Sequence, residues 1–208
     1  PLTYRSGCER GRLVVGCTKI VLYLIPESCQ GIGISLLQYS KSTLEVEPMI
    51  QGLHHNAYRC RNSEETRQFY EDFLELPLAN AFEIKETKTG REALALHTFY
   101  RMADGSFLAF FEVPDAPFEF KAQHDYDLHI ALEVNSETLH RMLEKGKATG
   151  IETRGISDHG FIDSIYFRDP NGYVIELTAK RPDHNEVIGS EVKARRVLDR
   201  WTASLTTN

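Results

Sequence analysis

A regular pattern of hydrophobic and polar positions begins near residue 50. The segment 53–60 has the character of a strand, and a helix follows that begins at Asn62 or Ser63 with glutamates in its first turn. Its buried face is predicted by the apolar residues at helical spacing, which are Phe69, Phe73 and Leu76. Three extended runs complete this part of the chain, at 79–86, 92–102 and 106–113.

The same order of elements recurs in the second half of the chain. A strand at 127–134 precedes a helix that begins at Ser136 and ends near Gly150. Three further strands are expected, at 151–156, 163–168 and 173–179.

Two pairs of stretches also match residue by residue, in the same order. With one gap, HNAYRCRNSEET at 55–66 aligns with HIALEVNSET at 129–138, and YRMADG at 100–105 aligns with FRDPNG at 167–172. A repeat of this kind indicates a duplicated module. The sequence therefore predicts an α+β fold of two tandem βαβββ modules, at about 50–115 and 125–180.

The two ends of the chain differ from this repeat. Residues 1–48 show no clean period, and we expect the functional domain to begin near Met49 and to extend to residue 180. The tail, 181–208, contains a predicted helix with one apolar stripe, formed by Ala194, Val197, Leu198, Trp201 and Leu205. We expect that stripe to dock on the domain or on a partner subunit.

Charge and composition exclude several classes of partner. The chain carries 24 basic and 30 acidic residues, and it has no basic cluster and no glycine-rich phosphate loop. A nucleic-acid or anionic-membrane partner is therefore not expected. The apolar run 12–26 is interrupted by Lys19 and is too short to span a bilayer. Four cysteines without a C-x-x-C pair suit a reducing, cytoplasmic location.

The repeat singles out candidate metal ligands. It pairs His55 with His129, and strand alternation then places the neighbouring His54 on the packed side of the first strand. Glu176 lies in the apolar last strand, where a buried carboxylate needs a partner. If both halves enclose one cavity, His55, His129 and Glu176 form a facial triad. Such a triad suits Fe2+, with Mn2+, Zn2+ and Ni2+ as alternatives.

Several features together resemble the vicinal oxygen chelate superfamily, which includes glyoxalases, bleomycin-resistance proteins and type I extradiol dioxygenases. They are the βαβββ repeat, the H-x-A pattern that opens each half, Phe69-Tyr70 with Leu74, and YFRDPNGYVIEL at 166–177. The resemblance covers about residues 50–180. It implies a half-barrel around a divalent metal, ligands at His55, His129 and Glu176, a small-molecule substrate and a homodimer.

Within that family the residues favour an extradiol dioxygenase that acts on a catechol-like aromatic. Tyr166 lies ten residues before Glu176, the spacing of a tyrosine next to the metal in that group. His159 is a candidate acid–base residue. The strands also carry many rings that could line an aromatic pocket, namely Phe99, Tyr100, Phe107, Phe110, Phe111 and Tyr166.

A glyoxalase-like lyase or isomerase is the main alternative, and it needs a fourth, acidic ligand. Glu112, seventeen residues before His129, is the candidate. Counted from the turn glycines, however, the equivalent of Glu176 is Ala109, so Glu112 reaches the same face only if a bulge intervenes. A metal-free drug-binding protein is a third alternative, and the candidate histidines and Glu176 count against it.

Overall fold

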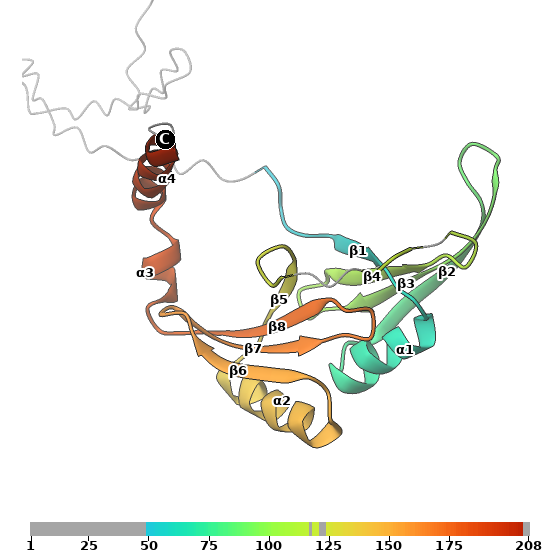
Figure 1. The fold of residues 1–208 in the computed structure, drawn as a ribbon, viewed down its shortest axis with the longest axis horizontal. Helices are drawn as coiled ribbons and strands as arrows, with labels where there is room; N and C mark the ends of the chain where they lie inside the picture. Colours follow the sequence, from blue (N-terminus) through green and yellow to red (C-terminus); the bar gives the residue numbers. More distant parts are fainter. Residues whose placement is uncertain (1–48, 117, 121–123, 206–208) are drawn as a thin grey trace, which may run out of the picture. The chain divides into compact units, whose positions relative to one another are not determined.

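The computed structural model describes residues 49–116, 118–120 and 124–205 (Figure 1). The expectations for residues 1–48 therefore lie outside the described residues. The first module consists of β1 (His55–Arg59), α1 (Ser63–Arg67), η1 (Gln68–Phe73), β2 (Leu78–Glu86), β3 (Glu92–Arg101) and β4 (Phe107–Glu112). The second consists of β5 (His129–Glu133), α2 (Ser136–Thr149), β6 (Thr153–Asp158), β7 (Ile162–Arg168) and β8 (Val174–Lys180).

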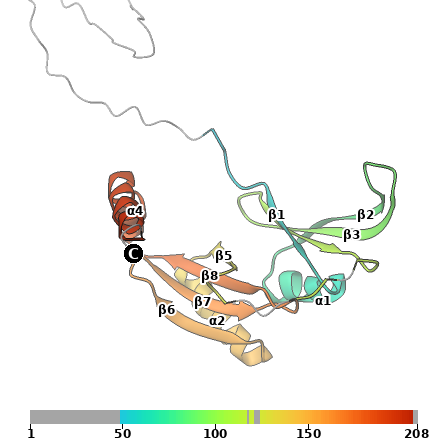
Figure 2. The ribbon, with the colours of Figure 1, turned by 45° about the horizontal axis from the view of Figure 1, so that its top comes forward.

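Each module forms one four-stranded mixed sheet with the same topology. The strand orders are β1-β4-β3-β2 and β5-β8-β7-β6, and in each sheet only the first pair of strands is parallel. The helix α2 covers one face of the second sheet (Figure 2). This repeated arrangement confirms the predicted α+β fold of two βαβββ modules.

The helix of each module begins where the sequence indicates. The side chain of Asn62 accepts hydrogen bonds from the backbone N–H groups of Glu64 and Glu65, and Asn135 caps α2 in the same way. The first helix differs from the expected single α-helix, because from Gln68 onward it continues as the π-helical turn η1. The wider turn accommodates three buried aromatic side chains on one face, those of Phe69, Tyr70 and Phe73.

The turn between β7 and β8 joins the two modules. Asp169 and Asn171 of this turn are buried, and the Tyr70 hydroxyl donates to the Asp169 carboxylate at 3.1 Å. Asn171 accepts from the backbone N–H of Arg61 at 2.8 Å and donates to Thr66 at 3.3 Å. The turn that the sequence marks as Asp-Pro-Asn-Gly is therefore also a polar connection between the modules, next to a hydrophobic core that both modules share.

An ion-pair cluster on the surface also connects the first module to α2 of the second. Glu75 pairs with Arg141 at 2.8 Å and with Lys145 at 2.9 Å, and both cations belong to α2. Their hydrogen bonds lower the pKa of Glu75 to about 2. Glu75 has a φ of 65°, in the left-handed region that non-glycine residues rarely adopt. These contacts hold the carboxylate where η1 ends.

The tail forms two helices, α3 (His184–Ile188) and α4 (Glu191–Leu205). The predicted apolar stripe lies on α4. Its larger side chains are about half exposed or more, namely Val197, Leu198, Trp201 and Leu205. The stripe therefore does not dock on the described part of the domain. Among the helices between residues 49 and 205, none combines the length and the apolar composition of a membrane span.

Candidate metal centre

Two of the three candidate ligands lie together on the second sheet. His129 begins β5 and Glu176 lies in β8, beside Ala131 in the parallel register of these strands. Glu176 is buried, with 5% of its surface exposed, whereas the His129 side chain is 42% exposed. The distance between His129 Nε2 and Glu176 Oε2 is 3.3 Å. The buried carboxylate thus has the partner that its position in an apolar strand requires.

The orientation of the His129 ring is set by the backbone. Its Nδ1 lies 2.7 Å from the carbonyl oxygen of Asp125. A carbonyl oxygen only accepts hydrogen bonds, so Nδ1 carries the proton and donates it. In the neutral ring the lone pair is then on Nε2, the atom that faces Glu176. An Nδ1–H bond to a backbone carbonyl is the arrangement commonly found in metal-ligating histidines.

This pair fits a divalent cation. With neutral His129 and ionised Glu176, two lone pairs face each other at 3.3 Å, which is repulsive unless a positive charge lies between them. Metal–ligand bonds of about 2.1 Å place adjacent ligand atoms about 3.0 to 3.4 Å apart. Without a metal, a second proton on His129 would satisfy the same pair. The chemistry and spacing of these donors therefore suit an ion such as Fe2+, Mn2+ or Zn2+.

Of the other two candidate residues, Tyr166 contacts this pair directly, and His159 is connected to it through Tyr166. The Tyr166 hydroxyl donates to Glu176 Oε1 at 3.2 Å, and His159 Nε2 lies 2.8 Å from the same hydroxyl. Because the phenol proton points to the carboxylate, His159 donates its Nε2–H to the phenol oxygen. Burial, followed by the nearby charge of Glu176, raises the pKa of Tyr166. The result is a continuous chain from exposed His159 to the buried carboxylate.

An ion pair between Arg154 and Asp125, which the sequence did not reveal, lies next to His129. Arg154 of β6 forms a 2.7 Å ion pair with the Asp125 carboxylate, and its guanidinium lies 5.2 Å from the centre of the Tyr166 ring. The hydrogen bond from Arg154 lowers the pKa of Asp125. Nothing in the spacing of these residues along the chain predicts that they meet.

His55 lies in the first module, on the face of β1 that strand alternation predicts. His55 and Ala57 are exposed. The Nδ1 atoms of His54 and His55 are 2.8 Å apart. His54 is exposed rather than packed, which corrects the prediction, because the chain that enters β1 is uncovered and residues 49–55 are all exposed.

The face that carries His55 is aromatic. The His55 ring lies 5.6 Å from Phe99, and His97 stacks on Phe111 at 3.6 Å between ring centres. His97 is a residue whose position the sequence analysis missed, although it shares the period of Phe99. Two of the expected pocket rings, Tyr100 and Phe110, are instead fully buried in the core, because they occupy the alternate positions of β3 and β4.

Glu112 lies away from this face. In the register of the first sheet Ala109 pairs with Ala57, as Glu176 pairs with Ala131 in the second. Three positions later, the Glu112 carboxylate accepts a 2.7 Å hydrogen bond from the backbone N–H of Ser63, the first residue of α1. An acid at a helix N-terminus is stabilising. The structure thus gives Glu112 a contact with α1 and none with His129 or Glu176.

Across the described ranges, no three His, Cys, Asp or Glu side chains gather closely enough to hold a metal. His129 and Glu176 are together in the second module, and His55 stands on the aromatic face of the first. Within the described chain, the three predicted ligands are therefore not assembled in one place: His129 and Glu176 form a pair, and His55 lies apart from them.

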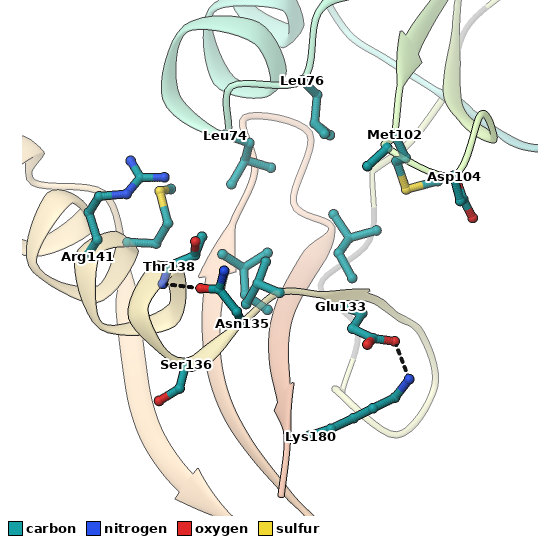
Figure 3. Close-up of a pocket in the computed structure, with 15 residues that line it drawn as sticks. Leu74, Leu76, Met102, Asp104, Glu133, Asn135, Ser136, Thr138, Arg141 and Lys180 are labelled. Atoms are coloured by element: carbon teal, nitrogen blue, oxygen red, sulfur yellow. Dashed lines mark hydrogen bonds and ion pairs between the residues drawn. The ribbon is translucent and has the colours of Figure 1, made fainter.

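A cavity of about 690 Å³ lies elsewhere, between the modules (Figure 3). Its lining includes Leu132 and Leu177, which alternate with Ala131 and Glu176 and so belong to the opposite face of the second sheet. On its rim Glu133 pairs with Lys180 at 2.6 Å (Figure 3). Because Glu133 and Lys180 on its rim pair with each other and its floor belongs to the sheet face opposite Glu176, we do not assign substrate to this cavity.

Comparisons with known proteins agree with the fold. The model of the Glyoxalase/Bleomycin resistance protein/Dioxygenase superfamily matches residues 52–177. A glyoxylase/bleomycin resistance protein/dioxygenase domain from Frankia sp. EAN1pec is similar, with 18% identity and a TM-score of 0.51 over 64% of this chain and 99% of that one.

The fosfomycin resistance protein FosX from Listeria monocytogenes is also similar. Its monoclinic form at pH 6.5 has 25% identity and a TM-score of 0.50, over 65% of this chain and 98% of that one. Another structure of FosX, with a TM-score of 0.47, contains Mn(II) and sulfate. Comparison with curated proteins gave no match.

Proposed function

Because the chain belongs to the Glyoxalase/Bleomycin resistance protein/Dioxygenase superfamily, we propose that it is a metal-dependent enzyme with ligands His55, His129 and Glu176. We propose ring cleavage of a catechol-like aromatic, of the extradiol type, as its reaction. The observation that carries the proposal is the pair of His129 Nε2 and Glu176 Oε2 at 3.3 Å, with Nδ1 of His129 fixed by a backbone carbonyl.

The number of protein ligands distinguishes this proposal, which needs three, from the glyoxalase-like alternative, which needs four. Two imidazoles and one carboxylate leave open positions on an octahedral ion, as oxygen-activating Fe2+ sites require. A bound Fe2+ ion would supply the affinity for both substrate oxygens and for O2. The alternative needs an acidic fourth ligand, and Glu112 instead contacts the N-terminus of α1. Mn2+, Zn2+ and Ni2+ remain the alternative metals for the same donors.

The surrounding residues have roles that suit an aromatic diol. The His159–Tyr166 pair can hold or deliver a proton next to Glu176, because both side chains are within hydrogen-bond reach of one another. The rings of Phe99 and Phe111 lie on the face that carries His55 and offer flat apolar surface to a substrate ring.

The location of His55 supports a homodimer. The modules of one chain are connected through α1, η1 and the Asp169 turn. The strands β1 and β5, which carry His55 and His129, are both edge strands, and β8 with Glu176 lies next to β5. We propose that the first sheet of one copy faces the second sheet of its partner. His55 of one copy would then complete the site that contains His129 and Glu176 of the other.

Parallel assays of anaerobically reconstituted protein test the proposed reaction. With Fe2+ and catechol, we expect oxygen consumption and a yellow ring-fission product. Conversion of a hemithioacetal without oxygen consumption would instead support the lyase or isomerase. Binding of neither Fe2+ nor another divalent metal in stoichiometric amount would favour the metal-free binding protein.

A further inference from the structure

We infer that Arg154 is a positioning residue that holds His129 and Glu176, the two candidate ligands of the second module, in their mutual geometry. The inference rests on the proposed metal site. It assigns a role to a side chain that touches neither ligand itself. Arg154 acts through two different neighbours, Asp125 and Tyr166, and each of these contacts one ligand directly.

The first connection runs to His129. Arg154 Nη2 donates to Asp125 Oδ2 at 2.7 Å, and the backbone carbonyl of the same aspartate accepts the His129 Nδ1–H at 2.7 Å. Asp125 lies in the turn that precedes β5 and belongs to no strand or helix. The ion pair with Arg154 of β6 therefore helps to fix the position of the Asp125 carbonyl group, which would otherwise be set by the turn alone.

The second connection runs to Glu176. Arg154 and Tyr166 are direct neighbours in the antiparallel register of β6 and β7, with the guanidinium 5.2 Å from the ring centre. A cation over an aromatic face restrains the orientation of the ring. The hydroxyl of that ring donates to Glu176 Oε1 at 3.2 Å. One guanidinium thus restrains the partners of both ligands.

Stability alone does not account for this arrangement. Arg154 and Asp125 are 47% and 28% exposed, and exposed ion pairs contribute little to folding. Partners of metal ligands, in contrast, commonly change metal affinity when they are removed. Metal affinity and ligand geometry are therefore the properties in which the role of Arg154 would be detected.

The test is a Co2+ titration of the metal-free full chain, with binding and the visible absorption spectrum followed together. We expect Arg154→Met to weaken Co2+ binding about tenfold, with an altered spectrum and an unchanged melting temperature. Arg154→Lys is expected to restore part of the affinity, because it keeps a charge for Asp125. Adding Asp125→Asn to Arg154→Met is expected to cost little more, because both changes break the same ion pair.

Arg181→Met is the matched control. Arg181, the residue after β8, forms ion pairs with Asp163 at 2.7 Å and with Asp158 at 2.8 Å, without contact to either ligand. It should leave Co2+ affinity and spectrum unchanged. Wild-type affinity and spectrum in Arg154→Met would overturn the positioning role while leaving the metal site intact. Absence of Co2+ binding in the wild type would instead overturn the proposed function.

Discussion

The Glu176→Gln variant is expected to lose metal binding by at least about a hundredfold, beyond the effect typical of residues that only orient a ligand. Gln keeps the size of the side chain and an acceptor for the Tyr166 hydroxyl, but it removes the negative charge that faces His129 Nε2 at 3.3 Å. Anaerobic Fe2+ titration of the metal-free protein measures this loss. Wild-type affinity in the variant would exclude Glu176 as a ligand.

His140→Ala is a suitable control for this experiment. Like His129, His140 donates its Nδ1–H to a backbone carbonyl at 2.7 Å, but it lies exposed on α2. We expect it to bind Fe2+ as the wild type does. A loss of affinity in this variant would show that the assay responds to the removal of any histidine.

The Glu176→Gln variant, combined with His55→Ala, also tests the proposed homodimer. Glu176→Gln and His55→Ala are each expected to bind poorly alone. After the two are mixed and re-paired, about a quarter of the wild-type sites should return, because half of the dimers are mixed and each has one intact site. No recovery after verified exchange of subunits would contradict a site shared between two copies.

Asp169→Ala is expected to destabilise the domain by about 2 to 3 kcal/mol, because it leaves buried donors without acceptors. The carboxylate accepts from Tyr70 at 3.1 Å and from the backbone N–H groups of Asn171 and Tyr173 at 2.9 and 2.8 Å. Urea unfolding at pH 7 measures the change in the free energy of unfolding.

A pH series refines this prediction. Burial raises the pKa of Asp169 above its usual 3.8, so ionisation of this group opposes folding. Its contribution is fully favourable below 3.8 and is lost as pH rises through the raised pKa. The Asp169→Ala variant should lack this slope. We therefore expect the variant to lose more stability, relative to the wild type, at low pH than at pH 7.

Asp104→Ala is the matched control in the turn of the first module. Asp104 is exposed, and among the described residues its carboxylate accepts hydrogen bonds from Ser106 alone, within the same turn. We expect a cost below about 1 kcal/mol. Equal effects of the two substitutions would contradict a structural role for the Asp169 turn between the modules.

Periodicity predicted most of the fold because each element carries a buried face of its own. The repeat of strand, helix and three strands is visible in the sequence, and the structure confirms this order of elements. Strand alternation places His55 and Ala57 on one face of β1, and both are exposed in the structure. The register counted from the turn glycines also gave Ala109 as the equivalent of Glu176, as the strand pairing confirms.

Contacts between distant elements were beyond that reasoning. Asp169 reads as an ordinary turn residue, and its contact with Tyr70 follows only from the docking of one module on the other. Arg154 reads as an exposed strand residue, and its pair with Asp125 depends on the path of the turn before β5. Alternation also failed for His54, because nothing covers the chain where it enters β1, and both His54 and His55 are exposed there.

The most direct test of the metal site is the amount of divalent metal bound per chain after anaerobic reconstitution. We predict one ion per chain in the wild type, and none in His55→Ala or His129→Ala. His54→Ala should keep one ion, with at most about tenfold weaker affinity. His54 is not a proposed ligand, and its Nδ1 instead contacts the Nδ1 of the proposed ligand His55. No stoichiometric metal in the wild type, or full occupancy in His129→Ala, would contradict the assignment.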